Sequence, residues 1–575
     1  MSIARWDIMG KYSMRSVDMQ KRMLLLWALL AALCVTTTLA ATDTVIQGVV
    51  IDTAGKPVRG ALVRASTADK AIARFSQADG RYQITVPAGS YDVTVEAYGF
   101  APKKQTTDTT QAGETSFRLA SRWDYNHLSS ADVESLLPND ADTQLINAAC
   151  MSCHSYATIL NRRGSTSAEW KSFVTHMTRD RMFQPEFSPD LLERLGAALE
   201  NKFGPNSPYF GPNSALPTRD KIKHADLSDA ALQATVREYT VPVPGVFVHS
   251  LTVDSQDSVW FSEYDFQSNK MGRFHIDSEK FEEYPISTPR AHPHNTVVGK
   301  DGRAWISLNN AGIDAKLASV DPETGRVKEY KWPEMRDSGA HAFWVDKDGN
   351  LWMSSSADSE VFFFDVKKEQ FKGVKYDRAT SIPPESALAY EQIPGKPSTL
   401  PTTKIAQYDV ARDSKGIVWL SETLLGTIVG VNPATGETRR YKAPGVTYIR
   451  GITIDSYDNV WFSGFGGHKL GKLNTDTGTF TMYQPPTINA DPYGLLVDKK
   501  TGDIWYSDYN GNSITRFDPK TEKFVEYPIP TRNAYPRFMG QDTKGRVWFS
   551  EWWSGKLGMV DPGDSGVKQA SAAAH

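Results

Sequence analysis

Residues 301–307 read Asp-Gly-Arg-Ala-Trp-Ile-Ser, and repeated versions of this stretch decide the fold of the chain. A Trp followed by an apolar residue and then Ser recurs seven times. The seven runs are Trp260-Phe261-Ser262, Trp305-Ile306-Ser307, Trp352-Met353-Ser354, Trp419-Leu420-Ser421, Trp461-Phe462-Ser463, Trp505-Tyr506-Ser507 and Trp548-Phe549-Ser550. Successive runs lie 42 to 47 residues apart, except for 67 residues between Trp352 and Trp419, where a Pro/Ser/Thr-rich insertion around 381–403 predicts a long loop. A period of this length indicates a repeat architecture.

Each repeat has room for four short strands, so seven repeats predict a seven-bladed β-propeller over residues 237–562, with 563–575 as a tail. The last repeat stops after Pro562 without a fourth strand, whereas residues 237–242, Arg-Glu-Tyr-Thr-Val-Pro, supply one ahead of the first repeat. We expect the ring to close by lending this strand to the last blade, because closure removes exposed strand edges. The repeated Trp residues then fill the space between blades.

Polar side chains recur where the innermost strand of each blade should begin, next to the end of the second strand. The first positions are His249, His294, His341, Gln407, Arg450, Tyr493 and Arg537. The second positions are Glu263, Leu308, Ser355, Glu422, Gly464, Asp508 and Glu551. Packing alone does not require this polarity, so the pattern predicts a funnel that binds a small molecule.

Three histidines at equivalent positions of consecutive blades, His249, His294 and His341, are the candidate catalytic residues, because imidazoles serve as general bases and metal ligands. A divalent metal in the funnel would have His292, Glu263 and Glu551 as further candidate ligands. Arg450 and Arg537 suit a carboxylate or oxyanion. The alternative is that these residues only hydrogen-bond water.

The repeat P-H-x₆-D-G-x-x-W-F-S-E … K-x-G-R … E-Y-P-I resembles the streptogramin B (virginiamycin B) lyases over all of 237–562. The resemblance implies a His base, a magnesium ion and C–O elimination from a cyclic depsipeptide. The lyase motif E-P-H-G is matched by Ala291-His292-Pro293-His294, which gives His294 the role of the base. The two metal-binding glutamates of the family are His292 and, roughly, Asn309 here.

Residues 150–154, Cys-Met-Ser-Cys-His, form the attachment signature of a c-type haem inside a helical region, 125–235. Cys150 and Cys153 would form thioethers, and His154 would be the proximal iron ligand. A zinc site lacks further ligands nearby, and a disulfide does not require the histidine. The stretch also resembles small c-type cytochrome domains reading C-x-x-C-H … E-W … V-x-x-M, which implies Met177 as the second axial ligand. Met182 and His176 are alternatives, and Met177 could instead be a core residue.

The N-terminal region holds short strands separated by Gly/Pro turns over residues 44–120, which predicts a β-sandwich. Its pattern G-x-V-x-D-x-x-G-x-P-V-x-G-A-x-V, followed by D-G-x-Y and P-x-G-x-Y-x-V, resembles the carboxypeptidase regulatory-like domain. Such domains are usually accessory, and no catalytic pattern occurs in this one.

Residues 1–40 read as a Sec-type signal peptide, because Lys21-Arg22 precede a short apolar run and small residues end it. Its removal would take away five basic and two acidic residues and leave a net charge of −6, which gives no reason to expect nucleic-acid binding. We expect export to the periplasm and no membrane span after cleavage.

The expected fold is therefore mainly β, with a seven-bladed propeller, an N-terminal sandwich and a small helical cytochrome c-type domain. The leading functional hypothesis is a periplasmic oxidoreductase that binds a small organic substrate on the propeller. One covalent haem c would pass electrons to a partner cytochrome or other carrier. One alternative is lyase-like, metal-assisted elimination with an accessory cytochrome. The other is a propeller that only binds.

Overall fold

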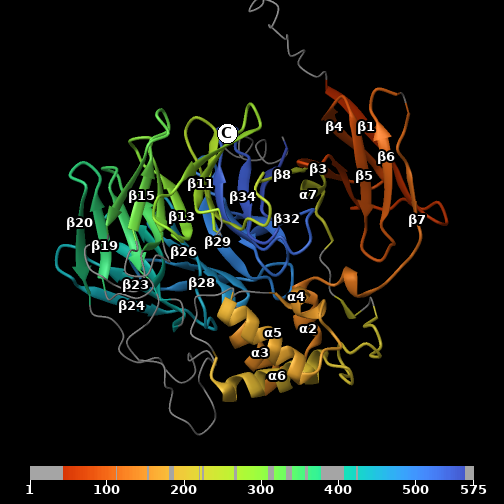
Figure 1. Ribbon diagram of the computed structural model, residues 1–575, viewed down its shortest axis with the longest axis horizontal. Coiled ribbons are helices and arrows are strands. Elements are labelled where there is room, and N and C mark those ends of the chain that lie inside the picture. The colour runs from red at the N-terminus through yellow and green to blue at the C-terminus, as the bar shows by residue number, and fades with distance from the viewer. Residues whose placement is uncertain are drawn as a thin grey trace, which may run out of the picture.

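The computed structural model describes residues 43–111, 113–151, 155–180, 187–218, 221–222, 226–264, 268–308, 316–331, 340–355, 360–376, 407–422 and 425–563. These residues form a sandwich, a helical segment and a large ring of β-sheets (Figure 1). The insertion predicted around 381–403 lies outside them, as do the proposed signal peptide and Asn309.

The N-terminal sandwich consists of two facing sheets with strand orders β4-β1-β7 and β6-β5-β2-β3. Alternate residues of β4 and β5 are buried, as expected for strands with one face on a core that includes Val63, Ile84, Val93 and Val95. This part confirms the predicted β-sandwich. Its strands are β1 (Asp43–Asp52), β2 (Leu62–Ser66), β3 (Lys70–Phe75), β4 (Arg81–Pro87), β5 (Ser90–Glu96), β6 (Lys103–Asp108) and β7 (Phe117–Leu119).

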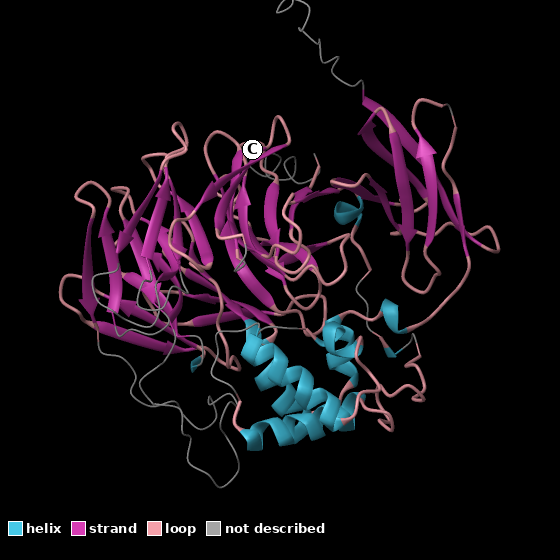
Figure 2. Cartoon of the chain, in the orientation of Figure 1, coloured by secondary structure: helices cyan, strands magenta, loops and turns pink. Residues whose placement is uncertain are grey.

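Most of the helical segment gathers on one side of the ring, whereas its last short helix lies apart, next to the sandwich (Figure 2). Its core includes Val133, Ile146, Trp170, Leu195 and Phe203. Side-chain caps fix the helix starts: Asp140 accepts a hydrogen bond from the backbone of α3, and Ser188 does so for α6. The elements are η1 (Tyr125–His127), α2 (Ser130–Leu136), α3 (Ala141–Cys150), α4 (Tyr156–Leu160), α5 (Ser167–Asp180), α6 (Pro189–Phe203) and α7 (Asp229–Leu232).

Seven four-stranded blades follow, and the innermost strand of each contacts the innermost strands of both neighbours, so the ring is closed. Blade 1 is β9 (Val248–Val253), β10 (Ser258–Glu263), β11 (Lys270–His275) and β12 (Lys280–Pro285). Blade 2 is β13 (Pro293–Val298), β14 (Ala304–Leu308), β15 (Lys316–Val320) and β16 (Val327–Lys331). Blade 3 is β17 (Ala340–Val345), β18 (Leu351–Ser355), β19 (Glu360–Asp365) and β20 (Gln370–Lys375).

Blade 4 is β21 (Gln407–Arg412), β22 (Val418–Glu422), β23 (Thr427–Val431) and β24 (Thr438–Lys442). Blade 5 is β25 (Ile452–Ile454), β26 (Val460–Gly464), β27 (Lys469–Leu473) and β28 (Phe480–Tyr483), with η5 (Phe465–Gly467) between β26 and β27. Blade 6 is β29 (Pro492–Val497), β30 (Ile504–Asp508), β31 (Ser513–Asp518) and β32 (Lys523–Pro528). Blade 7 is β33 (Pro536–Gln541), β34 (Val547–Glu551), β35 (Lys556–Asp561) and β8 (Thr235–Thr240).

The repeated Trp residues are buried between blades, as predicted. Five of the seven indoles also donate a hydrogen bond, at 2.8 to 3.1 Å, to an Asp six residues earlier in the same turn, for example Trp548 to Asp542. This bond explains why an Asp turn precedes the Trp.

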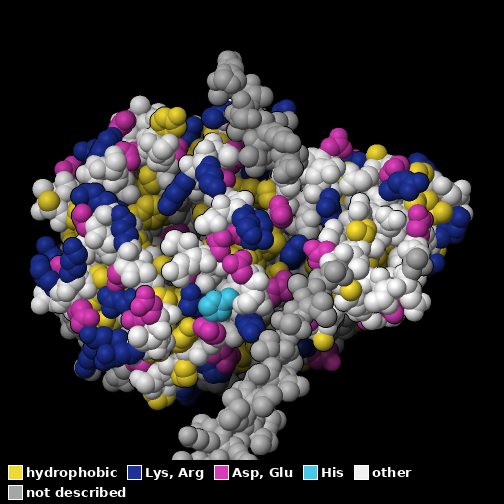
Figure 3. Space-filling view, turned by 90° about the horizontal axis from the view of Figure 1, so that it is seen from above, with side chains coloured by type: hydrophobic (Ala, Val, Ile, Leu, Met, Phe, Trp, Pro, Cys, Tyr) yellow, Lys and Arg dark blue, Asp and Glu magenta, His cyan; other side chains and the backbone are white. Residues whose placement is uncertain are grey.

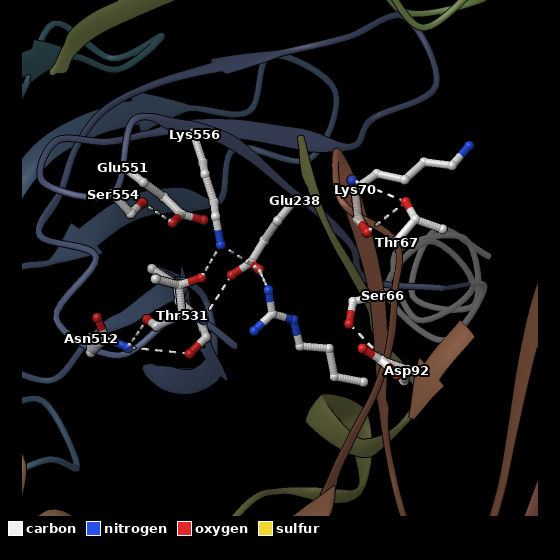
Figure 4. A network of polar contacts seen from close by, with 12 residues as sticks. Ser66, Thr67, Lys70, Asp92, Glu238, Asn512, Thr531, Glu551, Ser554 and Lys556 are labelled. Atoms are coloured by element: carbon white, nitrogen blue, oxygen red, sulfur yellow. Dashed lines mark hydrogen bonds and ion pairs between the residues drawn. The ribbon is translucent and has the colours of Figure 1, made fainter. Parts of the chain in front are cut away.

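The closing strand β8 pairs antiparallel with β35, which confirms the predicted closure with bounds two residues earlier. Its other edge pairs with β3 of the sandwich, so one eight-stranded sheet runs from the innermost strand of blade 7 into the N-terminal region. Glu238 is buried at this junction (Figure 4), where it accepts from the backbone of Thr531 at 2.7 Å and pairs with Lys556 and Arg64 at 3.4 and 3.2 Å. No sequence pattern predicted this pairing between the sandwich and the ring.

Among the described residues, no helix is long and apolar enough to span a membrane. On the face seen in Figure 3, basic and acidic side chains are interspersed, and neither sign gathers into an extended patch.

Candidate functional site

One residue from each blade lines the centre of the ring at the mouth of its innermost strand. In every blade the strand-two Ser accepts a hydrogen bond from a strand-one amide, as Ser262 does from Ser250 at 3.0 Å, and the residue before that amide faces the axis. The same bond occurs in the other six blades. These seven residues, called the inner ring, are His249, His294, His341, Tyr408, Arg450, Tyr493 and Arg537, all buried.

Blade 4 corrects the predicted set, because Tyr408 and not Gln407 occupies the inner ring. Gln407 lies one residue earlier, and its amide donates to the hydroxyl of Tyr376 at 3.0 Å and to the carbonyl of Glu360. The spacing could have revealed this: the ring residue lies 13 residues before the strand-two Ser in most blades, and 13 residues before Ser421 is Tyr408.

The three histidines lie side by side with tilted rings, and their equivalent positions predicted this proximity. Ring centroids are 3.8 Å apart for His249 and His294, and 4.6 Å apart for His294 and His341. His341 Nδ1 lies 2.6 Å from the carbonyl of Tyr408 in the next blade. The structure therefore brings the three candidate catalytic residues into one row.

Burial keeps these imidazoles neutral at neutral pH. It lowers the pKa of His249 well below its ordinary value, and the neighbouring His294 and Arg537 lower it further. The pKa of His294 is likewise lowered well below the ordinary value by burial, His341 and Arg537. The pKa of His341 falls to about 3, first through burial. A neutral imidazole can accept a proton or donate one hydrogen bond.

The other side of the inner ring carries the positive charge. The guanidinium of Arg537 lies 3.7 Å from the ring centroid of Trp552 and 5.3 Å from that of Tyr493. The guanidinium of Arg450 lies 4.6 Å from the centroid of Tyr408. The hydroxyls of Tyr408 and Tyr493 are in hydrogen-bond contact across the ring.

The predicted metal ligands differ in how they relate to the histidines, and among them His292 interacts electrostatically with His294. The carboxylate of Glu263 is hydrogen-bonded to Ser268, and burial raises its pKa to about 7. Glu551 accepts from Ser554 at 2.5 Å, and burial followed by Glu238 raises its pKa well above the ordinary value. Both carboxylates are bound within their own blades. His292 has its pKa lowered to about 4 by burial and Arg290, and its ring lies 5.0 Å from that of Tyr264.

Among the described residues, one group of three metal-ligating side chains has all its ligand atoms within 4.8 Å of one another: Glu134, His468 and Asp491. It joins α2 to blades 5 and 6, with His468 Nδ1 at 2.9 Å from Asp491 and Nε2 at 3.6 Å from Glu134. Burial alone would lower the pKa of His468, but Asp491 and Glu134 outweigh it and raise it to about 9. This group, called the clamp, forms ion pairs between the imidazole and the two carboxylates.

The helical segment docks on the face of the ring where the inner strands begin. The hydroxyl of Ser155 donates to that of Tyr535 at 2.9 Å, and Thr158 also contacts it. Tyr535 is buried and lies two residues before Arg537. Asn510 of blade 6 donates to Glu134 at 2.9 Å. Sequence reasoning identified neither Tyr535 nor the clamp.

The haem-attachment residues are only partly described. Cys150 ends α3 and packs against the core of the helical segment. Cys153, His154 and Met182 lie outside the described residues, as does the side chain of Met177, while His176 is exposed. Haem attachment and its axial ligand remain predictions.

The profile of the virginiamycin B lyase family matches residues 396–571, and that of the carboxypeptidase regulatory-like domain matches residues 45–120. The chain carries a virginiamycin B lyase-like domain. The lyase-like match covers blades 4 to 7, apart from β8, and does not include His249, His294 or His341.

Solved structures cover a larger share of the chain than the lyase-family profile does. Selenomethionine-substituted virginiamycin B lyase from Staphylococcus aureus is 21% identical, with 57% of this chain and 99% of that chain covered and a TM-score of 0.47. A streptogramin B lyase structure is 22% identical, with 58% and 99% covered and a TM-score of 0.49. No curated protein matches the chain in the sequence search.

Proposed function

We propose that the chain is an exported periplasmic oxidoreductase whose inner ring binds a small organic substrate. The helical segment would carry one haem c on Cys150 and Cys153, with His154 and Met177 as iron ligands. A haem c, when bound, accepts single electrons and passes them on, here to a partner cytochrome or other carrier.

The observation that carries this proposal is the docking of the helical segment beside the inner ring. Ser155, the first residue after the haem motif, binds Tyr535. The ring of Tyr535 lies 5.0 Å from that of Tyr509, which lies 5.7 Å from the inner-ring residue Tyr493. Two aromatic steps therefore link Tyr535, the partner of Ser155, to the inner-ring residue Tyr493, which supports the proposal.

Cys150 is partly buried against the apolar core of the helical segment. A cysteine at this place has apolar neighbours, which a planar apolar cofactor can contact. This setting supports the proposed attachment.

The first test is the mass and absorption spectrum of the full chain, expressed with its leader in a host that matures c-type cytochromes. We expect the added mass of one haem, and its loss in Cys153→Ser. The matched control, Ser165→Ala, changes a partly exposed residue of the same segment and should keep the haem. A wild-type chain without haem would overturn the redox function.

The second test asks whether haem and funnel communicate. In the haem-loaded protein, Tyr535→Phe removes one hydroxyl at the contact, and we expect a shift of the haem midpoint potential, because such potentials respond to nearby polar groups. Tyr457→Phe, at an exposed tyrosine, is the control. Equal potentials in both variants would separate the haem from the funnel.

Lyase-like elimination remains the second candidate, because the family match covers blades 4 to 7. It would use His294 as the base and a divalent metal in the funnel. Turnover of a cyclic depsipeptide that stops with a chelator and in His294→Ala, but continues in Cys153→Ser, would favour it. A chain that binds ligands without turnover in any form would favour the binding-only alternative.

A further inference from the structure

Arg537 is a buried cation without a counter-charge. Its side chain is 7% exposed, and its Nε is buried without a hydrogen-bond partner. Within the part of the chain that the structure describes, no carboxylate pairs with this guanidinium. Burying an unpaired charge is costly, so its place in the centre of the ring calls for a compensating group.

Aromatic rings supply part of that compensation. The guanidinium lies over Trp552 at 3.7 Å and faces Tyr493 and Tyr509 at 5.3 and 5.9 Å. Burial acts to lower the pKa of Arg537, but Tyr493 and Tyr509 outweigh it, so the group stays charged. Cation–π contacts are worth less than a charge-assisted pair with an anion, so they leave the site short of negative charge.

The remaining groups that face Arg537 do not supply an anion. The three ring histidines are neutral, and Arg450 is a second cation. The Asp491 carboxylate interacts with Arg450 and pairs with His468 Nδ1 at 2.9 Å. The centre of the ring therefore carries a net positive charge, with neutral imidazoles on one side and aromatic rings on the other.

We infer that the funnel binds a small organic carboxylate whose carboxylate group pairs with the guanidinium of Arg537. The planar guanidinium presents two parallel N–H donors, which match the two oxygens of a carboxylate. The body of the ligand would lie against the flat rings beside Arg537. This inference takes the funnel as the substrate site, as the proposed function does, but it does not depend on the haem.

Binding of such an anion has a chemical consequence for the histidines. Arg537 is one of the charges that lower the pKa of His249, His294 and His341. A carboxylate that neutralises Arg537 raises those pKa values. The ligand would thus make the adjacent imidazoles better bases for a proton that leaves it.

The experiment is calorimetric titration of the full chain with benzoate, with its neutral isostere benzamide and with inorganic phosphate. We expect benzoate to bind and benzamide to bind far more weakly. Arg537→Gln should weaken benzoate by about 10- to 100-fold, the range for loss of a charged hydrogen-bonded pair. Arg439→Gln, at an exposed arginine of blade 4, is the matched control and should bind as the wild type does.

Several results would overturn the inference: no saturable binding of benzoate, equal binding of benzamide, or unchanged affinity in Arg537→Gln. Tighter binding of phosphate than of benzoate would overturn the assignment to carboxylates. None of these results bears on haem attachment, so failure here and failure of the redox function are distinguishable.

The unfolding temperature of Arg537→Gln separates ligand binding from a purely structural role for Arg537. Without ligand, Arg537→Gln should unfold at the same temperature as the wild type or higher, because the variant loses an unpaired buried charge. A lower unfolding temperature would assign the arginine to stability instead. If Arg537→Gln does not fold, Arg537→Lys keeps the charge without the planar fork and should bind benzoate with intermediate affinity.

Discussion

The two sides of the inner ring bury polar side chains in different protonation states, neutral on one side and charged on the other. On the side of blades 1 to 3, three imidazoles contact one another with tilted rings and stay neutral, so no charge is buried there. On the side of blades 5 to 7, two guanidiniums stay charged and lie against aromatic rings, and the helical segment docks beside them. The first side is suited to proton transfer, and the second to holding an anion.

The docking side depends most on Tyr535, so its removal should have the largest effect. Tyr535→Ala deletes a buried ring that packs on Tyr509 and loses the contacts with Ser155 and Thr158. We expect the free energy of unfolding to fall by about 3–5 kcal/mol. Urea unfolding followed by tryptophan fluorescence measures this.

The control for that experiment is Tyr457→Ala, because Tyr457 is 83% exposed and should change stability little. Similar losses in both variants would mean that the helical segment is not held to the ring through Tyr535.

The clamp on the same side gives a pH dependence opposite in sign to that of the histidine side, whose lowered pKa values reduce stability as pH falls below 6.5. His468 has its pKa raised to about 9, so the protonated form stabilises the fold fully below the unfolded value of 6.5. This contribution is lost as pH rises from 6.5 through 9. Glu134, whose pKa is raised to about 7 mainly by burial, acts in the same direction at lower pH.

We therefore expect the urea midpoint to decrease between about pH 6.5 and 9, and His468→Gln to flatten this decrease. The effect should be smaller than that of Tyr535→Ala, because the clamp is partly exposed. Asp491, Glu134 and Asp508 are the charged groups that face His468. His275→Gln, at a histidine outside the clamp, should keep the wild-type slope; an unchanged slope in His468→Gln would rule out this assignment.

The contrast between the two sides also marks what the sequence could and could not predict. The histidine row followed from a strict repeat, because equivalent positions of successive strands must meet around an axis. The same logic predicted the closing strand, which pairs with β35 as expected. A sequence repeat therefore predicts where equivalent residues of successive blades lie relative to one another.

The docking side had no such repeat to rely on. Tyr535 and Glu134 meet their partners across 377 and 334 residues of chain, through Thr158 and His468, and no local pattern encodes such contacts. The second-strand carboxylates show a different limit. Glu263 and Glu551 end the second strands of their blades, as predicted. Their side chains, however, accept hydrogen bonds from Ser268 and Ser554 within the same blades. Which face a strand-end residue uses depends on register, and one-residue slips reverse it.

The boundary between the two sides gives the smallest and sharpest prediction. Tyr408 accepts from Ser354 and binds His341 through its backbone carbonyl, while its hydroxyl contacts Tyr493. Tyr408→Phe breaks only the hydroxyl contact, so we expect a loss of about 1 kcal/mol in the free energy of unfolding. Because the carbonyl stays and the ring that lies 4.0 Å from the imidazole is kept, the imidazole resonances of His341 should move little in the NMR spectrum. Movement of these resonances would mean that the two sides of the ring are coupled through Tyr408 and do not act separately. The neighbouring Gln407→Ala should leave the Tyr408–Tyr493 contact intact and thus provides the matched control, since the Gln407 amide binds outward to Tyr376.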